Sequence, residues 1–490
     1  MNGSSAAVAG VDVSMDHWIG GRRVASSDRF ANASPIDGSE QGELSAGGQA
    51  EVDMAVDAAR SAFTGWAALG AEGRKPILDE FAKGILARAE DLAAVETVDN
   101  GSLLMGNLHR VVPRAAQNIS FFADWAMTLQ DHVIDHEEVT NNIRYDPSGV
   151  AALITPWNAP LMLTTWKIGP ALAAGNTIVV KPPEWAPLTC SLLADIAHEA
   201  GVPAGVLNVV QGIGEEAGDA LVNHPDLARI SFTGSTDTAK IIGQAAARSI
   251  IPMSSELGGK SPFIVCADAD LDSAAQTVAM QYINAGQVCL AGTRILVEAS
   301  IEEAFLEKVR AAVGHMTVGD PREATTRVGP LIHPEHFARV SGFVERAKAA
   351  GAEVLWGGGQ SDAGDMYFQP TMFANPGVDA EISQSEVFGP VLTWQTFETD
   401  EEAIAFANAT QYGLAGTLFS GNEDRAMRIA SQVVAGTLWV NCFFVRDLAA
   451  PFGGSRISGI GREGGTHSFD FYCDIKNIAV RKGSFAPRGN

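Results

Sequence analysis

Three side chains of the sequence could carry out chemistry on a carbonyl group: those of Cys289, Glu256 and Asn158. A cysteine thiol can act as a covalent nucleophile, and a nearby glutamate can deprotonate the water that hydrolyses the resulting thioester. The Asn158 amide can donate to a developing oxyanion. Each residue type also has a more common structural use. Free cysteines usually pack in cores, glutamates are usually solvated, and an asparagine between prolines usually makes a turn.

The positions of these residues favour the chemical interpretation. Asn158 and Glu256 each follow a short apolar run that predicts a strand, in LITPWNAP and IPMSSELGG. Cys289 lies in GQVCLAGTR, between a helical stretch and the strand-like run TRILVEAS. Because ligand sites of α/β proteins form at the ends of strands, we expect these three segments to border a cleft.

Two series of strand-like runs, each interrupted by helices, predict two doubly wound α/β domains. The first series contains VAALITP, NTIVVKPP, GVLNVVQG and ARISFTGS, with helical stretches such as 187–200 between them. The second begins with SPFIVCAD and ends with GTLWVNC. The glycine pair Gly258-Gly259 suggests a boundary near 258.

The N-terminal region is expected to be helical after a loose tail. Residues 51–69 place apolar side chains on one helical face, and Pro76 is expected to open a second helix. The first fifteen residues are small and polar, without a signal-peptide pattern, and are expected to form the tail.

Composition excludes several classes of function. The 490 residues include 34 Lys and Arg against 58 Asp and Glu, and the net charge of -24 repels nucleic acid and anionic membrane surfaces. The longest apolar region, about 150–180, is interrupted by prolines and by Lys167, so no membrane span is expected. The five cysteines lie far apart without a C-x-x-C pair, which indicates a reducing, cytoplasmic setting and no metal site.

Taken together, these motifs resemble the aldehyde dehydrogenase superfamily from about residue 17 to 480. The cysteine motif stands as NAGQVCLAGTR, the glutamate motif as ELGGKSP and the asparagine motif as TPWNAP. Further blocks are VVKPPE at 179–184, FTGS at 232–235, EVFGP at 386–390, and PFGG with SGIGREGG within 451–465.

The resemblance implies an oxidation in which Cys289 attacks an aldehyde and hydride leaves to a nicotinamide cofactor. The Asn158 amide and the Cys289 backbone N–H would hold the oxyanion, and Glu256 would activate the hydrolytic water. Lys167 matches a lysine that the family places near a proton-exit route, but we favour the alternative of a lysine on a helix surface.

The resemblance also implies a domain plan. The NAD-binding domain would comprise 1–125 and 148–258, and the catalytic domain 259–456. A small β oligomerisation element, 126–147 with 457–490, would bridge subunits of a homodimer or homotetramer.

The cofactor site is expected around FTGS, because Gly234 allows close backbone approach and Ser235 can open a helix over 236–248 whose free N–H groups attract phosphate. A plain helix cap is the alternative. Glu184 can accept from a ribose hydroxyl and repels a further phosphate, which favours NAD over NADP, although Lys181 could offset this repulsion. The resemblance implies cofactor contacts by Trp157, Lys181, Glu184, Gly234, Ser235, Leu257, Glu386 and Phe388. Gly212, in the glycine-rich string QGIGEEAG, could belong to a dinucleotide fingerprint or simply make a strand-to-helix turn.

The resemblance implies that the segment VRDL at 445–448 lines the substrate tunnel. A guanidinium in a substrate tunnel is costly to desolvate without an anionic partner, so Arg446 predicts a carboxylate on the aldehyde, with Arg114 as a second contact. The blocks around both arginines resemble the muconic semialdehyde subgroup, and Ala159 should widen the tunnel. The alternatives are that Arg446 pairs with Asp447 or another acid and only shapes the loop, and that the enzyme prefers aromatic or aliphatic monoaldehydes.

Other interpretations receive less support. His132 with His136, and His333 with His336, have spacings that could hold a metal ion but lack further ligands nearby. The run DHVIDHEE is expected at the surface. A coenzyme A-acylating enzyme would not need Glu256, and a non-catalytic homologue would not need Cys289, Glu256 and Asn158 together.

Overall fold

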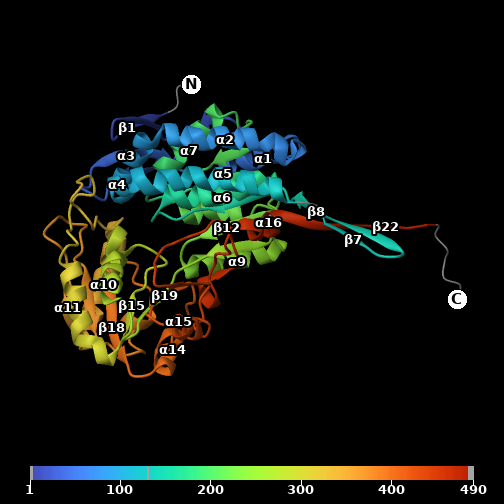
Figure 1. Cartoon of the computed structure of the whole chain (residues 1–490). Coiled ribbons are helices and arrows are strands. Elements are labelled where there is room, and N and C mark those ends of the chain that lie inside the picture. Colours follow the sequence, from blue (N-terminus) through green and yellow to red (C-terminus); the bar gives the residue numbers. More distant parts are fainter. Residues whose placement is uncertain (1–3, 130–131, 484–490) are drawn as a thin grey trace.

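The computed structural model describes residues 4–129 and 132–483 (Figure 1). Two mainly parallel sheets, each covered by helices, form the body of the molecule, and a narrow β-ribbon projects from it. Two hairpins lie near the N-terminus: β1 (Ser5–Val8) with β2 (Val11–Ser14), and β5 (Arg29–Ala33) with β6 (Glu40–Ser45).

The first sheet has the strand order β21-β13-β12-β9-β10-β11-β3-β4. Its strands are β3 (His17–Ile19), β4 (Arg22–Val24), β9 (Val150–Ile154), β10 (Thr177–Lys181), β11 (Leu207–Val209), β12 (Arg229–Thr233), β13 (Met253–Glu256) and β21 (Gly459–Ile460). The strands from β9 to β13 run parallel. Every residue of β9 and β10 is buried, which explains their unbroken apolar sequences, because helices cover both faces of a parallel sheet.

Alternate side chains of the first sheet enter two separate cores. Ala151 and Leu153 pack with α2, α5, α6 and α7, whereas Val150 and Ala152 pack with α1, α8 and α9 on the other face. The helices of this half are α1 (Gln49–Ala68), α2 (Gly70–Ala87), α3 (Ala89–Asn100), α4 (Leu104–Gly106), α5 (Val112–Thr128), α6 (Pro160–Ala174), α7 (Leu188–Glu199), α8 (Asp219–Val222) and α9 (Thr236–Ser249). The helix expected over 187–200 is therefore confirmed as α7.

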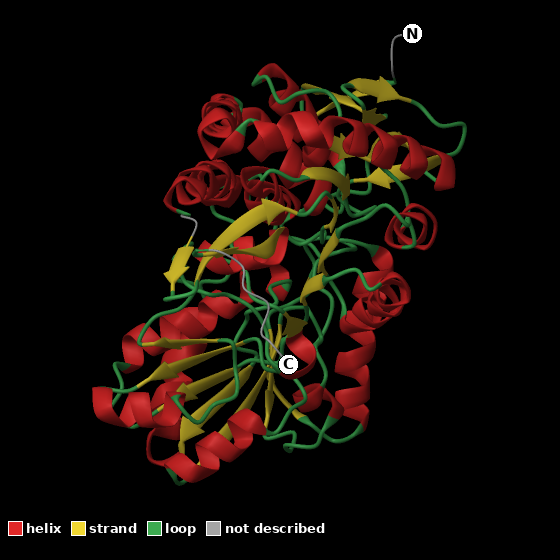
Figure 2. Cartoon of the chain, turned by 90° about the vertical axis from the view of Figure 1, so that its right-hand side faces the viewer, coloured by secondary structure: helices red, strands yellow, loops and turns green. Residues whose placement is uncertain are grey.

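The chain passes from the first sheet to the second between Glu256 and Pro262. The second sheet has the order β16-β17-β18-β15-β14-β19-β20, and Figure 2 shows its strands as a fan with helices on both sides. Its strands are β14 (Pro262–Val265), β15 (Arg294–Glu298), β16 (Glu353–Trp356), β17 (Thr371–Ala374), β18 (Val391–Phe397), β19 (Ala415–Phe419) and β20 (Thr437–Val440). Its helices are α10 (Leu271–Ala279), α11 (Glu302–Val313), α12 (Pro334–Ala349), α13 (Glu381–Gln384), α14 (Asp400–Asn408) and α15 (Glu423–Ala430).

After β20 the chain returns to the first half of the molecule. β21 pairs with β13, and α16 (Gly465–Tyr472) packs against α6. The last strand, β22 (Cys473–Arg481), then joins β7 (His132–Asp135) and β8 (Val139–Pro147) in the projecting ribbon (Figure 1). Residues 132–138 are exposed, as expected for DHVIDHEE, whose first residue lies outside the described residues.

Two expectations about the N-terminal region are wrong. The first residues do not form a loose tail from position 4 onward, because Val8, Val13 and Met15 are buried in the β1–β2 hairpin region. Pro76 does not open its helix, since α2 begins at Gly70. The turn that precedes the proline is anchored by buried Arg74, which donates to backbone carbonyls of α6 and α1, a tertiary contribution that local sequence does not reveal.

No helix among the described residues is long and apolar enough to cross a membrane.

Candidate active site

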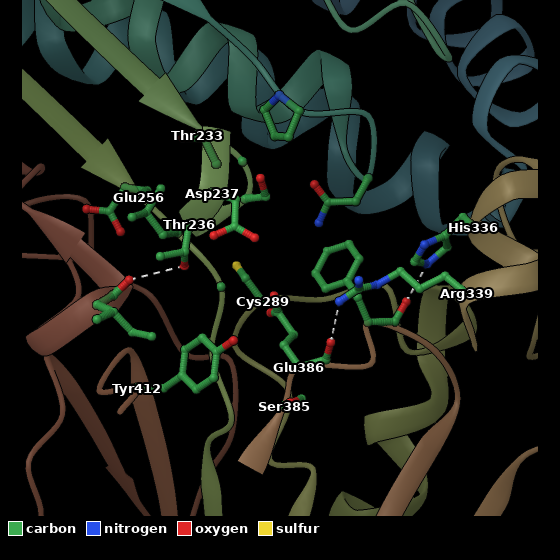
Figure 3. Close-up of a pocket in the computed structure, with 18 of the residues that line it drawn as sticks. Thr233, Thr236, Asp237, Glu256, Cys289, His336, Arg339, Ser385, Glu386 and Tyr412 are labelled. Atoms are coloured by element: carbon green, nitrogen blue, oxygen red, sulfur yellow. Dashed lines mark hydrogen bonds between the residues drawn. The ribbon is translucent and has the colours of Figure 1, made fainter. Parts of the chain in front are cut away.

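A cavity of about 590 Å³ lies between the ends of β9, β12 and β13 and the loops of the second sheet (Figure 3). Residues of both halves of the molecule therefore line the same space. Of the site residues expected from sequence, those that line it are Trp157, Asn158, Gly234, Ser235, Glu256, Leu257, Cys289, Glu386 and Phe388. Those that do not are Lys167, Lys181, Glu184, Gly212, Arg114 and Arg446.

Cys289 is half-buried on a sharply bent loop before β15. Asn284 and Ala285 have positive φ angles of 51° and 53°, and Gly286 follows with 69°. A Cβ at Gly286 would lie 2.1 Å from the carbonyl oxygen of Gly389, so glycine is required where the two loops cross. Burial, with the negative charges of Glu386 and Glu256, raises the pKa of the Cys289 thiol to about 12. The thiol is therefore protonated near neutral pH and needs a base.

Asn158 is bound to the cysteine loop in both directions. Its Nδ2 donates to the carbonyl oxygen of Gln287 at 3.0 Å, and the Nδ2 of Asn284 donates to the backbone carbonyl oxygen of Asn158 at 2.9 Å. The helix that follows, α6, is held at its start by Glu96, whose Oε1 accepts from the Leu161 N–H at 3.2 Å. One N–H of the Asn158 amide remains for a group in the cavity.

Glu256 ends β13 with its carboxylate buried. Neither carboxylate oxygen has a hydrogen-bond partner among the described residues. Burial raises the pKa of Glu256 well above its usual range, and the charge of Glu463 raises it further, against the opposing charges of Lys167 and Arg446. Glu256 thus has the features of a strong base that is not held by any other side chain.

The expectation that Lys167 lies on a helix surface is wrong. Its side chain is fully buried in α6, and Nζ lies 2.9 Å from both Glu463 Oε1 and Ser231 Oγ. The indole N–H of Trp166 donates to the other oxygen of Glu463. A buried ammonium requires such a partner, and here the partner comes from a segment almost three hundred residues further along the chain.

The start of α9 forms one wall of the cavity. Ser235 caps the helix, because its Oγ accepts from the Thr238 N–H at 3.1 Å. Gly234, Ser235, Thr236 and Asp237 all line the cavity, so the positive end of the helix faces this space. Ser235 therefore caps a helix whose first residues line the cavity.

Lys181 and Glu184 do not line this cavity and form an ion pair, with Nζ and Oε2 2.7 Å apart. Gly212 adopts a φ of 144°, and a Cβ there would lie 2.8 Å from the Cβ of Ala217 and 3.0 Å from the Gly47 nitrogen. Glycine is therefore required by close packing at this turn.

Glu386, labelled in Figure 3, and Phe388 line the cavity from the loop before β18. Glu386 Oε1 accepts from the Gly259 N–H at 2.8 Å, and burial raises the pKa of Glu386 to about 7. Leu257 lies alongside, its N–H donating to the Ser458 carbonyl oxygen. The hydrogen bond between Glu386 and Gly259 joins the segment EVFGP, which contains Glu386, to the segment ELGGKSP, which contains Gly259.

Arg446 has no acidic partner within salt-bridge distance among residues 4–129 and 132–483. Its guanidinium carbon lies 3.8 Å from the ring centre of Phe452 and 4.8 Å from that of Trp166. The expected alternative of an Arg446–Asp447 pair is wrong, because Asp447 Oδ1 accepts from the Ala449 N–H instead. Arg114 donates to the Arg446 carbonyl oxygen at 3.0 Å.

This pair of guanidinium groups is electrostatically unfavourable. Burial, together with the like charge of Arg114, lowers the pKa of Arg446 to about 10. The charges of Glu256 and Glu463 oppose these effects, although neither carboxylate forms a salt bridge with Arg446.

Several residues of the site were not expected from sequence. Glu463 lies within a quoted motif, SGIGREGG, but its role depends on a long-range contact. Further lining residues are Asp237, Lys240, His336, Arg339, Gln384, Gln411 and Tyr412. His336 was considered only as one of a metal-binding pair. Among the described residues no cluster of three or more His, Cys, Asp or Glu side chains could hold a metal ion, and the described cysteines are free.

Comparison with known proteins agrees with this arrangement. This chain is 42% identical over 480 residues to the 2-hydroxymuconic semialdehyde dehydrogenase of Pseudomonas sp. (strain CF600), covering 95% of this chain and 99% of that protein. It is 39% identical to the 2-aminomuconic semialdehyde dehydrogenase of Danio rerio, over 95% and 98% of the two chains.

Solved structures give the same result. The indole-3-acetaldehyde dehydrogenase AldA of P. syringae, in complex with NAD+ and IAA, matches with a TM-score of 0.94 and 38% identity, covering 96% of this chain and 97% of that chain. HpcC of Thermus thermophilus matches with a TM-score of 0.94 and 41% identity over 98% of each chain. The model of the aldehyde dehydrogenase family matches residues 23–478. The chain therefore belongs to the aldehyde dehydrogenase family.

Proposed function

We propose that the protein oxidises an aldehyde to a carboxylic acid with NAD as cofactor, using Cys289 as the nucleophile, Glu256 as the base and Asn158 as an oxyanion donor. The observation that carries this proposal is that three segments from different elements bring a thiol, an unbonded carboxylate and an amide to one cavity. This combination suits acyl transfer through a thioester.

In the proposed reaction the Cys289 sulfur forms a bond to the aldehyde carbon, while the thiol proton passes through water in the cavity to the bulk solvent. The oxyanion accepts from the free N–H of Asn158 and from the Cys289 backbone N–H. Loss of hydride leaves a thioester on Cys289. Glu256 then takes a proton from water, the hydroxide oxygen displaces the sulfur, and the acid departs.

A proton taken up by Glu256 must leave the buried site. Lys167, Glu463 and Ser231 form a hydrogen-bonded group, and the charges of Lys167 and Glu463 lie close enough to Glu256 to affect its pKa. We assign this group the role of accepting the proton from Glu256, so that the base is regenerated after each cycle.

NAD supplies the hydride acceptor, and the residues present fit it. The start of α9, at Gly234 and Ser235, can hold phosphate, and the free oxygen of Glu386 can accept from a ribose hydroxyl. Trp157, Leu257 and Phe388 supply apolar surface for the nicotinamide. Lys181, Glu184 and Gly212 would hold the adenosine end. NAD is favoured over NADP because Lys181 is already paired with Glu184 and leaves no uncompensated cation there.

We further propose that the aldehyde carries a carboxylate, bound by Arg446. The support is a guanidinium that contacts two aromatic rings, has no salt-bridge partner among the described residues and is affected by the charge of a second guanidinium. The relatives named as muconic semialdehyde dehydrogenases fit this substrate class. Arg114 binds the Arg446 backbone, so it fixes that loop as well as adding charge.

The deciding experiment compares kcat/KM for a semialdehyde acid and its methyl ester, in the wild type and in Arg446→Ala. Loss of a charge-assisted contact should cost about 1.5–3 kcal/mol for the acid alone. Equal values for the two compounds in the wild type would point to monoaldehydes instead.

Identifying the product with and without coenzyme A decides between hydrolysis and acyl transfer to that thiol.

The remaining parts of the proposal concern organisation. We assign cofactor binding to 1–125 with 148–258, catalysis to 259–456, and subunit bridging to 126–147 with 457–490. Exposed apolar residues on the ribbon support a homodimer or homotetramer; these are Val133, Ile134, Ile475, Ile478 and Val480. The free cysteines favour a reducing, cytoplasmic setting. Sedimentation that shows only monomer would contradict the assembly.

A further inference from the structure

Phe388 adopts a backbone conformation that a residue with a side chain rarely has. Its φ angle is 60°, in the left-handed region, and it is neither glycine nor asparagine. Residues held in this way persist only where surrounding contacts fix them, and they concentrate at functional sites. The contacts that fix Phe388 are therefore part of the site.

Helix α12 supplies these contacts from one face. The Nε2 of His336 lies 2.8 Å from the Phe388 carbonyl oxygen, and Arg339 Nη2 donates to the Glu386 carbonyl oxygen at 2.9 Å (Figure 3). Val340 lies against Gly389, where a Cβ would come within 2.7 Å of its side chain. Positions 336, 339 and 340 share a helical face, so α12 holds the backbone of 386–389 as one unit.

The protonation state of His336 follows from its partner. A carbonyl oxygen can only accept, so Nε2 carries the hydrogen. Burial lowers the pKa of His336 to about 4, with the charges of Arg339 and His333 acting in the same direction and the bond to Phe388 opposing them. The imidazole is therefore neutral near pH 7 and donates through Nε2.

The same imidazole contacts the other half of the molecule. Its ring centre lies 5.1 Å from that of Trp157, and Trp157 meets Phe388 edge to face at 5.2 Å. Trp157 directly precedes Asn158, which is bound to the cysteine loop. His336 thus lies between the segment that carries the amide and the segment that carries Phe388.

We propose that His336 is a positioning residue that holds Phe388 in its left-handed conformation and sets the spacing between Phe388 and the Trp157-Asn158 segment. The inference rests on the proposed function, in which Phe388 packs against the nicotinamide. His336 acts through Phe388 and Trp157 and takes no part in the bond changes.

The test uses His336→Ala, His336→Gln and a control, His315→Ala, whose histidine is exposed after α11. Three quantities are measured: the rate constant of the first NADH burst, the Kd for NAD by calorimetry, and the φ angle of Phe388 in crystals without cofactor. We expect His336→Ala to slow the burst by about tenfold, since small misplacements of reacting groups reduce rates strongly. The φ angle should become negative in this variant.

The Kd for NAD should change by less than about threefold in His336→Ala, because anchoring by the α9 start is intact. His336→Gln should recover most of the burst rate, since its amide N–H can replace Nε2–H as donor. His315→Ala should match the wild type.

An unchanged burst rate in His336→Ala, or a Phe388 that keeps its positive φ there, overturns the inference. A wild type that forms no NADH with any aldehyde would instead refute the proposed function. The crystallographic φ angle still reports on His336 in that case, so the two failures are distinguishable.

Discussion

Lys167 Nζ and Glu463 Oε1 lie 2.9 Å apart in a buried ion pair behind the candidate base. The two charges act on Glu256 in opposite directions, because Glu463 raises its pKa and Lys167 lowers it. Burying two charges costs desolvation energy. The attraction between the two charges offsets this cost only when their geometry is excellent. The electrostatic effect of the pair on Glu256 supports its proposed role in accepting a proton from that residue.

Replacing the nucleophile separates catalysis from cofactor binding. Cys289→Ala should abolish oxidation, because no other described cysteine lines the cavity. The Kd for NAD should stay within about threefold of wild type, since the α9 start and Glu386 are untouched. Calorimetry with NAD and a product assay measure the two effects. Residual turnover in the variant would assign the nucleophile elsewhere.

Replacing the base should stop the cycle halfway. Glu256→Gln should release one equivalent of NADH in a burst and then stall, because acyl transfer to sulfur precedes the water step. Rapid-mixing absorbance at the NADH band records the burst. Asp237→Asn, also at the cavity but exposed at the α9 start, is the control and should turn over repeatedly. Steady turnover of Glu256→Gln at the wild-type rate would refute the assigned base.

The buried ion pair predicts a shift in the pH profile. A general base works when deprotonated, so turnover should rise with pH through the pKa of Glu256. Burial and Glu463 raise that pKa whereas Lys167 lowers it, so Lys167→Met should move the rising limb to higher pH. The profile is measured at saturating aldehyde and NAD. Lys83→Met, on the exposed face of α2, serves as control. An unmoved limb in Lys167→Met would exclude this coupling.

A second buried acid predicts how stability depends on pH. Glu96 accepts from the Leu161 N–H and from Thr189 Oγ1, and burial raises its pKa to about 7 from an unfolded value near 4.5. Between these values the folded state binds more protons than the unfolded state. Stability should therefore fall as pH rises from 4.5 to 7, by at most about 3 kcal/mol from this group.

Glu96→Gln should remove its part of that slope while keeping an acceptor for Leu161. Denaturant unfolding at pH 5 and pH 8 measures the difference in both proteins. Because Asp99 is buried nearby with its pKa also raised, a smaller slope should remain in the variant. An identical slope in both proteins would show that Glu96 is ionised in the folded state at pH 5.

The catalytic segments could be predicted because they are local motifs at strand ends, as at Asn158, Glu256 and Cys289. Lys167 could not be placed, because its burial depends on Glu463, far away in sequence. The start of α2 was missed for the same reason, since Arg74 holds the turn before Pro76 through contacts with α6. Local pattern identifies which residues can react, whereas long-range contacts decide which of them are buried and paired.

Trp166 provides the last test, because it connects Arg446 to the buried pair. Its ring lies under the Arg446 guanidinium and its N–H donates to Glu463. Trp166→Leu removes both contacts, whereas Trp166→Phe removes the N–H but keeps an aromatic face.

If the ring holds Arg446 ready for a substrate carboxylate, Trp166→Leu should reduce the preference for a semialdehyde acid over its methyl ester. A cation–π contact of about 0.5–2 kcal/mol predicts a loss of roughly two- to thirtyfold. Trp166→Phe should keep most of the preference, and any effect that both variants share reports on Glu463 instead. The ratio of kcat/KM for acid and ester is the measurement, because it cancels general losses of activity. Equal preference in the leucine variant and the wild type would show that Phe452 alone suffices to hold Arg446 in place.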